Sequence, residues 1–210
     1  MHDDNPPSVG RRSALVAAAA VAIAPEVAHT APVDGAAAQM DELFRVHAGP
    51  SDPDPDDGRR GFDFFHGRWT VAHRNRKPLD IQAPWQEFTG VAECRPTVGG
   101  LVNVDDNILH RPSGMYRAST VRVFDPTKKQ WSIYWISEPT PVIDPAPVQG
   151  NFNDGVGLFY ADDSAEGKSF KVRFKWHRVT PNSARWEQAL STDGGTTWID
   201  NWFMDFTRKA

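Results

Sequence analysis

Large apolar side chains recur at every second position within residues 61–208, and this spacing limits the fold more than any other feature. Within residues 170–177, phenylalanine, valine and tryptophan alternate with lysine, arginine and histidine. A two-residue repeat places alternate side chains on opposite faces of a β-strand, whereas an amphipathic helix needs spacings of three and four. We therefore expect a strand with one apolar face and one charged face.

The same alternation continues through much of the chain. It is clear in residues 131–136, 184–190 and 198–206, and weaker in residues 69–74, 85–94, 101–109, 116–124 and 156–160. Asp193-Gly194-Gly195 predicts a tight hairpin, because glycine readily adopts the positive φ that such a turn needs. No helix-length pattern intervenes, which argues against parallel βαβ units. We predict an all-β, antiparallel up-and-down barrel of about 8–9 strands, with a two-sheet sandwich as the alternative.

The first quarter of the chain has a different composition. Residues 1–59 contain ten acidic and four basic side chains, and only one of the 23 aromatic residues of the chain. The run 51–57 consists of serine, aspartate and proline, a composition typical of a solvated linker. We therefore divide the chain into a leader (1–38), an acidic, Pro-rich linker (39–60) and a barrel (61–208).

The leader resembles a twin-arginine export signal. Arg11-Arg12 precedes an apolar run from Ala14 to Ala24, which is too short to cross a bilayer but has the length of a signal-peptide core. The small residues 36–38 would suit a cleavage site. We expect an exported protein, periplasmic or extracellular. The alternative is a disordered, Ala-rich tail on a cytoplasmic protein.

Charge and residue spacing argue against several functional classes. The net charge of −4 gives no electrostatic reason to expect nucleic acid as a partner. The single cysteine, Cys94, excludes an intramolecular disulfide and a cysteine-based metal cluster. The seven histidines show no metal-binding pair spacing, so we expect no metal and no cofactor; His110 would be the first candidate for a lone ligand. The oligomeric state is left open.

The apolar faces of the strands predict an aromatic-lined interior. An eight-stranded barrel has room either for packed side chains or for one small ligand. Rings that only fill the core are one interpretation, and a pocket for a small, largely apolar molecule is the other. We favour the pocket. The expected ligand-binding residues share the apolar parity of their strands: Trp131, Trp135, Phe174, Trp176, Trp186, Gln188 and Trp202.

Three charged residues are candidates for acid–base or charge-stabilising roles if the protein is an enzyme, such as a cyclase, isomerase or lyase. Asp200 lies between Trp198 and Trp202 on the apolar parity, where a carboxylate is costly to bury unless it is paired. Arg122 is a possible partner. Glu187 has the opposite parity, together with Asn201; both would face solvent, or would line the pocket if the inward parity is reversed.

Both ends of the barrel segment resemble one family. The run Phe62-Asp63-Phe64-Phe65-His66-Gly67-Arg68-Trp69 and the stretches 184–189 and 191–198 are similar to bacterial lipocalin-like proteins of the uncharacterised DUF1579 type. The resemblance implies a calycin-like β-barrel, often exported, and it implies no catalytic residues. Asp200 stands where glutamate is expected, which makes a role for this carboxylate less transferable.

Overall fold

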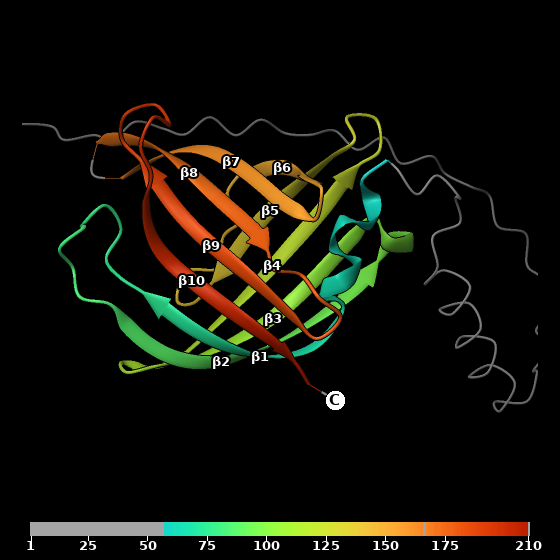
Figure 1. Cartoon of the computed structure of the whole chain (residues 1–210), viewed down its shortest axis with the longest axis horizontal. Helices are drawn as coiled ribbons and strands as arrows, with labels where there is room; N and C mark the ends of the chain where they lie inside the picture. The colour runs from blue at the N-terminus through green and yellow to red at the C-terminus, as the bar shows by residue number, and fades with distance from the viewer. Residues whose placement is uncertain (1–56, 166, 210) are drawn as a thin grey trace, which may run out of the picture.

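Ten antiparallel strands close into a barrel in the computed structural model, which describes residues 57–165 and 167–209 (Figure 1). The strands are β1 (Gly67–Asn75), β2 (Gln86–Thr97), β3 (Val102–Arg111), β4 (Gly114–Asp125), β5 (Gln130–Ser137), β6 (Val148–Asn153), β7 (Val156–Ala165), β8 (Lys168–His177), β9 (Ser183–Ser191) and β10 (Ile199–Arg208). Each strand pairs with its neighbours in the chain, and β1 pairs with β10. The predicted up-and-down barrel is confirmed, with ten strands instead of eight or nine.

The strand that the sequence pattern missed is β6. It has six residues, and a Cβ atom at its Gly150 would lie 1.9 Å from the carbonyl oxygen of Leu158 on β7. A glycine at this close backbone approach interrupts the side-chain alternation that identifies a strand. β6 pairs with β5 over only three residues, from Trp131 to Ile133, because β6 begins at Val148, the partner of Ile133.

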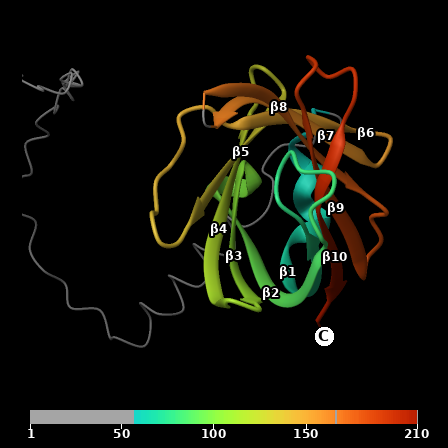
Figure 2. The same cartoon turned by 90° about the vertical axis from the view of Figure 1, so that its left-hand side faces the viewer.

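Alternate side chains point into the barrel, as the two-residue repeat predicts. In β1 the buried residues are Trp69, Val71 and His73, while their neighbours are exposed. The wall curves around one interior space, seen from a second direction in Figure 2. The aromatic side chains of several strands consequently meet in a common core.

A short 3₁₀ helix, η1 (Arg59–Phe65), closes one end of the barrel, which we call the base. Its Phe62 and Phe65 are fully buried among rings from the strands. The indole of Trp69 donates a hydrogen bond to the carbonyl oxygen of Phe65 at 2.7 Å, and that of Trp131 donates one to Gly58 at 2.9 Å. Residues 57–60, which the sequence assigned to the linker, therefore pack onto the barrel.

The predicted signal and most of the predicted linker lie outside the described residues. Among the described residues, none forms a helix with the length and apolar character needed to span a bilayer. At the end opposite η1, which we call the mouth, lie the loops 76–85, 138–147 and 192–198. In Figure 1, η1 and loop 76–85 mark these two opposite ends.

Candidate functional site

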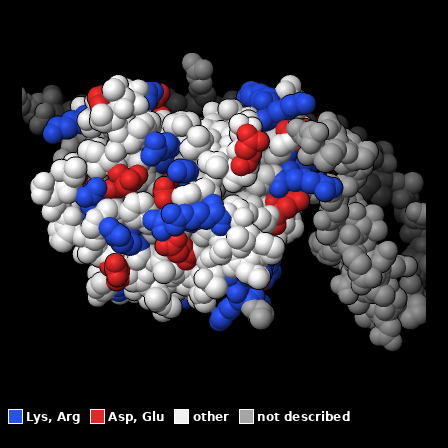
Figure 3. Space-filling view, in the orientation of Figure 1, with Lys and Arg blue, Asp and Glu red and all other residues white. Residues whose placement is uncertain are grey.

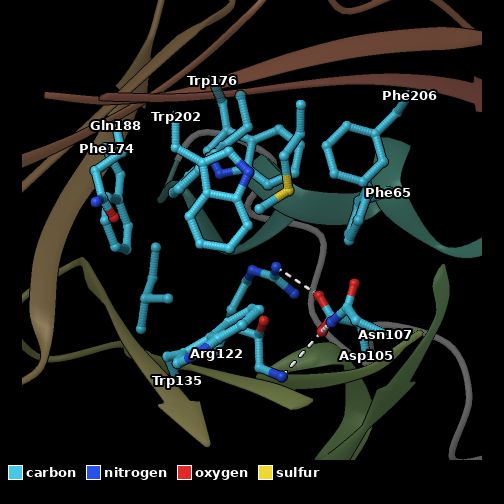
Figure 4. A pocket seen from close by; sticks show the side chains of 14 residues that line it. Phe65, Asp105, Asn107, Arg122, Trp135, Phe174, Trp176, Gln188, Trp202 and Phe206 are labelled. Atoms are coloured by element: carbon cyan, nitrogen blue, oxygen red, sulfur yellow. Dashed lines mark hydrogen bonds and ion pairs between the residues drawn. The ribbon is translucent and has the colours of Figure 1, made fainter. Parts of the chain in front are cut away.

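A cavity of about 160 Å³, which we call the deep chamber, lies inside the barrel above the base (Figure 4). Its walls come from η1, from β3–β5 on one side of the barrel and from β8–β10 on the other. The lining residues are Phe65, Asp105, Asn107, Thr120, Arg122, Ile133, Trp135, Phe174, Trp176, Trp186, Gln188, Trp202, Met204 and Phe206. All the residues predicted to bind a ligand are among them except Trp131.

Trp131 is part of the base instead. It is 1% exposed and packs edge-on against Phe62 at 5.1 Å between ring centroids, and it also contacts Phe124. Its indole N–H is satisfied by Gly58. Trp131 does have the predicted inward parity, but η1 covers it, so it belongs to the base and does not line the deep chamber.

One wall of the deep chamber is a connected set of aromatic rings. Trp202 contacts Trp186 at 5.7 Å and Trp135 at 6.1 Å between centroids, in near-perpendicular orientations. Phe174 contacts Trp186 at 4.9 Å. Edge-to-face contacts of this kind hold large rings in fixed positions, so the wall keeps its shape without a ligand.

The opposite wall is polar and comes from β3 and β4. Arg122 Nη2 donates to Asp105 Oδ2 at 2.6 Å, and Arg122 Nη1 donates to Asn103 Oδ1 at 3.1 Å. The backbone N–H of Thr120 and the side-chain amide of Asn107 donate to Asp105 Oδ1. Figure 4 shows Asp105, Asn107 and Arg122 on the side of the chamber facing Trp176, Trp202 and Phe206.

This polar wall contains a fully buried ion pair. The side chains of Arg122 and Asp105 are 4% and 2% exposed. The guanidinium also lies 5.0 Å from the ring centroids of both Phe62 and Phe65, within range of cation–π attraction. Two charges are tolerated inside the barrel because they neutralise each other and because hydrogen bonds satisfy both Nη atoms of Arg122 and both carboxylate oxygens of Asp105, while Arg122 Nε is buried without a hydrogen-bond partner in the described part of the chain.

A second cavity of about 350 Å³, the outer chamber, adjoins the deep chamber toward the mouth. The two share Ile133, Trp135, Phe174 and Gln188. The outer chamber lies where the pairing of β5 with β6 ends, and Asp144, Ala146, Pro147 and Val148 form part of its wall. The short pairing between β5 and β6 thus creates space beside the deep chamber.

A histidine lies behind the aromatic wall. His73 is 5% exposed, stacks on Phe88 at 4.7 Å, and accepts a hydrogen bond at Nδ1 from the indole N–H of Trp202 at 3.3 Å. Burial, together with the positive charges of Arg111 and His110, lowers the pKa of His73 to about 4. The imidazole is therefore neutral at pH 7, and it holds the indole of Trp202 in place.

Asp200 does not face the interior, contrary to the sequence prediction. A β-bulge between Asp200 and Trp202 changes the parity of β10. The Asp200 carboxylate is 44% exposed and lies 3.8 Å from Arg173, which also stacks on Trp198. Asn201, expected to share the parity of Glu187, is instead buried and accepts a hydrogen bond from Gln188 at 3.2 Å.

Glu187 also lies on the outer surface, as its parity predicts. Its carboxylate accepts hydrogen bonds from Arg185 at 2.8 Å and His177 at 2.9 Å. Burial opposes ionisation, but these two partners prevail and lower the pKa of Glu187. Basic and acidic side chains alternate on the face seen in Figure 3. The proposed catalytic set of Asp200, Glu187 and Arg122 is therefore split between the outer surface and the interior.

Sequence reasoning missed the polar residues of β3 and β4 apart from Arg122. Asn103, Asp105 and Asn107 recur at every second position of a segment that was predicted as a strand. Three polar residues on one parity signal either an outer face or a polar interior wall. Val104 and Ile108 on the other parity favour the wrong choice, an outer face for the three polar residues, so the local pattern does not reveal the polar wall.

Among the residues that the structure describes, the other cysteine and histidine candidates do not form a second site. Cys94 is buried, and burial raises the pKa of its thiol to about 12, so it is not a nucleophile at neutral pH. His110 is exposed at the end of β3. Within residues 57–165 and 167–209, no group of three or more histidine, cysteine or acidic residues has a geometry that could hold a metal ion.

Comparison with known proteins supports the fold alone. No protein-family description matches the chain, and no curated protein matches it. Among solved structures, the barrel is similar to an S-type phycobiliprotein lyase from Guillardia theta, with a TM-score of 0.50 and 12% sequence identity. The match covers 76% of this chain and 99% of the lyase chain. The chain thus has a lipocalin-like barrel fold.

Proposed function

We propose that this protein is an exported barrel that binds a small, largely apolar ligand in its interior. The observation that carries the proposal is the deep chamber, which is lined by preorganised aromatic rings and continues into the outer chamber. Concave, mostly apolar cavities with a few fixed polar groups are the usual form of small-molecule sites. A barrel fold shared with a phycobiliprotein lyase is consistent with an interior that acts on or holds a small molecule.

Export and family membership belong to the same proposal. The support for export is Arg11-Arg12 followed by the apolar run 14–24. The support for a relationship to the DUF1579 type is the pair of motifs at residues 62–69 and 184–198. In the structure, residues 62–69 form most of η1 and the start of β1, and η1 closes the base. Residues 184–198 form β9 and the hairpin loop after it, and β9 carries part of the aromatic wall.

Quenching of tryptophan fluorescence by bromobenzene tests the binding function. Its heavy atom quenches an indole only at close range, so occupation of the deep chamber gives saturable quenching. The variants Trp186→Phe and Trp202→Phe should each lose part of the quenched signal, and the double variant should lose more, because these two indoles are among the four that line the chamber. Trp198→Phe is the matched control, since Trp198 packs against Tyr160 and Arg173 on the outer surface.

If the saturable quenching is the same in Trp186→Phe and Trp202→Phe as in the unaltered protein, the bound bromobenzene lies outside the barrel. Quenching that rises linearly without saturation would indicate collisions in solution and no site. Either result contradicts the proposed function.

A further inference from the structure

The polar atoms that the deep chamber offers to a ligand are mainly hydrogen-bond acceptors. The clearest case is Asn107, which is 8% exposed and lines the chamber. A carboxylate only accepts hydrogen bonds, so the 2.5 Å contact with Asp105 fixes the nitrogen of the Asn107 amide toward Asp105. The amide oxygen therefore points away from Asp105, and no donor among the described residues binds it.

Thr120 and Gln188 add to this set. The backbone N–H of Thr120 donates to Asp105, but its hydroxyl has no partner among the described residues, although Thr120 is only 4% exposed. The Gln188 side chain donates to Asn201, which leaves its amide oxygen at the boundary between the two chambers. A hydroxyl can donate or accept, whereas the two amide oxygens can only accept.

The positive charge of Arg122 is already used. Its Nη2 is bound to Asp105 and its Nη1 to Asn103, and its face lies on Phe62 and Phe65. Its Nε has no hydrogen-bond partner among the described residues, but this atom is buried and is not exposed to a ligand. A ligand carboxylate would bring a second negative charge beside Asp105 with no further cation in the chamber lining to balance it. An ammonium would leave an uncompensated positive charge. Burial of either ion is costly, so the site favours an uncharged ligand.

The size of the deep chamber limits the buried part of the ligand to about one ring. Its volume of about 160 Å³ is close to that of an engineered apolar cavity of about 150 Å³ that binds benzene. The aromatic wall of Trp202, Trp186 and Phe174 matches the faces and edges of such a ring. Any larger part of the ligand would extend into the outer chamber.

We propose that the ligand of the deep chamber is a neutral, single-ring group that donates a hydrogen bond, as a phenolic hydroxyl or a ring N–H does, to Asn107 and Thr120. This inference rests on the proposed binding function and specifies its ligand class. It separates phenols and similar donors from hydrocarbons, ethers and carboxylates of comparable size.

Calorimetric titration with phenol and toluene tests the proposal, because the two molecules have nearly the same shape and only phenol donates a hydrogen bond. Thr120→Val removes the hydroxyl while keeping the shape of the side chain. We expect this variant to weaken phenol binding by about tenfold, as loss of one buried hydrogen bond would, and to leave toluene binding unchanged or tighter. Thr70→Val is the matched control, since Thr70 lies exposed on β1.

Ligand comparison on the unaltered protein gives a second test. Phenol should bind at least tenfold more tightly than anisole, in which methylation removes the donor, and than benzoate. Ethylbenzene has the size of anisole but no oxygen, so its affinity shows how much the larger substituent alone weakens binding. Equal effects of Thr120→Val on phenol and toluene would overturn the proposal, as would binding of anisole or benzoate as tight as that of phenol. If neither phenol nor toluene binds, the proposed function itself fails.

Discussion

At the scale of single residues, the interior is organised by polar groups that satisfy one another. Asp105 receives hydrogen bonds from Arg122, Asn107 and the backbone of Thr120, and this arrangement crosses from β3 to β4. Removal of one member of a buried ion pair typically costs about 3–5 kcal/mol, because the other charge is left unpaired. The pair therefore fixes the polar wall of the deep chamber in one geometry.

His73 makes stability depend on pH. Its pKa is about 4 in the folded barrel, while an unfolded histidine titrates near 6.5. Between these values the unfolded chain binds more protons than the folded one, so stability falls as the pH decreases through this range. The full loss, reached below both pKa values, amounts to about 3–4 kcal/mol, which is 2.5 pKa units at about 1.4 kcal/mol each. Urea unfolding measured from pH 7 to pH 4 should show most of it.

The variant His73→Asn isolates this contribution, since an amide oxygen can still accept the indole N–H of Trp202 and has no charge to gain. Its stability should decrease less between pH 7 and pH 4 than that of the unaltered protein. If the free energy of unfolding falls equally with pH in His73→Asn and in the unaltered protein, His73 does not cause the pH dependence.

At the scale of elements, η1 acts as the floor of the barrel. Phe62 is 0% exposed and contacts Trp131, Phe152, Phe159 and Trp176 at centroid distances of 4.9–6.0 Å. A seven-residue 3₁₀ helix has little intrinsic stability, so these ring contacts hold it in place. The order of the base therefore depends on the side chains of the two buried phenylalanines.

Phe62→Ala should consequently destabilise the barrel by about 3–5 kcal/mol, the usual cost of removing a buried phenylalanine ring. Phe64→Ala, in the same helix, should cost less because Phe64 is only partly buried. Denaturant unfolding followed by tryptophan fluorescence measures both. If Phe62→Ala and Phe64→Ala lower the free energy of unfolding by similar amounts, Phe62 is not the residue that mainly holds η1 in place.

The sequence predicted the strands better than it predicted their irregularities. The two-residue repeat of β8 and β9 identified Phe174, Trp176, Trp186 and Gln188 as interior residues, because nothing interrupts the pairing of these strands. In β10 the bulge shifts the pairing by one residue, which turns Asp200 outward. A bulge depends on the neighbouring strand, so the local pattern does not reveal it.

At the scale of the whole molecule, the barrel is a container with unequal ends. Phenylalanines of η1 close the base, while the deep chamber continues through Ile133 and Trp135 into the outer chamber. The pairing of β5 with β6 ends at Ile133, so the wall of the barrel gives way to loop 138–147 at this point. A ligand would pass this boundary to reach the aromatic wall.

Ile133 is therefore a position where a larger side chain should block binding. It is 4% exposed and lines both chambers. With toluene at about 100 times its Kd, binding should stabilise the unaltered protein by about 2.7 kcal/mol, which raises the melting temperature by roughly 5–11 °C. Ile133→Phe should abolish this increase because its ring extends into the space between the chambers. Ile136→Phe, on the outward parity of the same strand, should retain it. An undiminished shift in Ile133→Phe would mean that toluene stabilises the barrel from somewhere other than its interior.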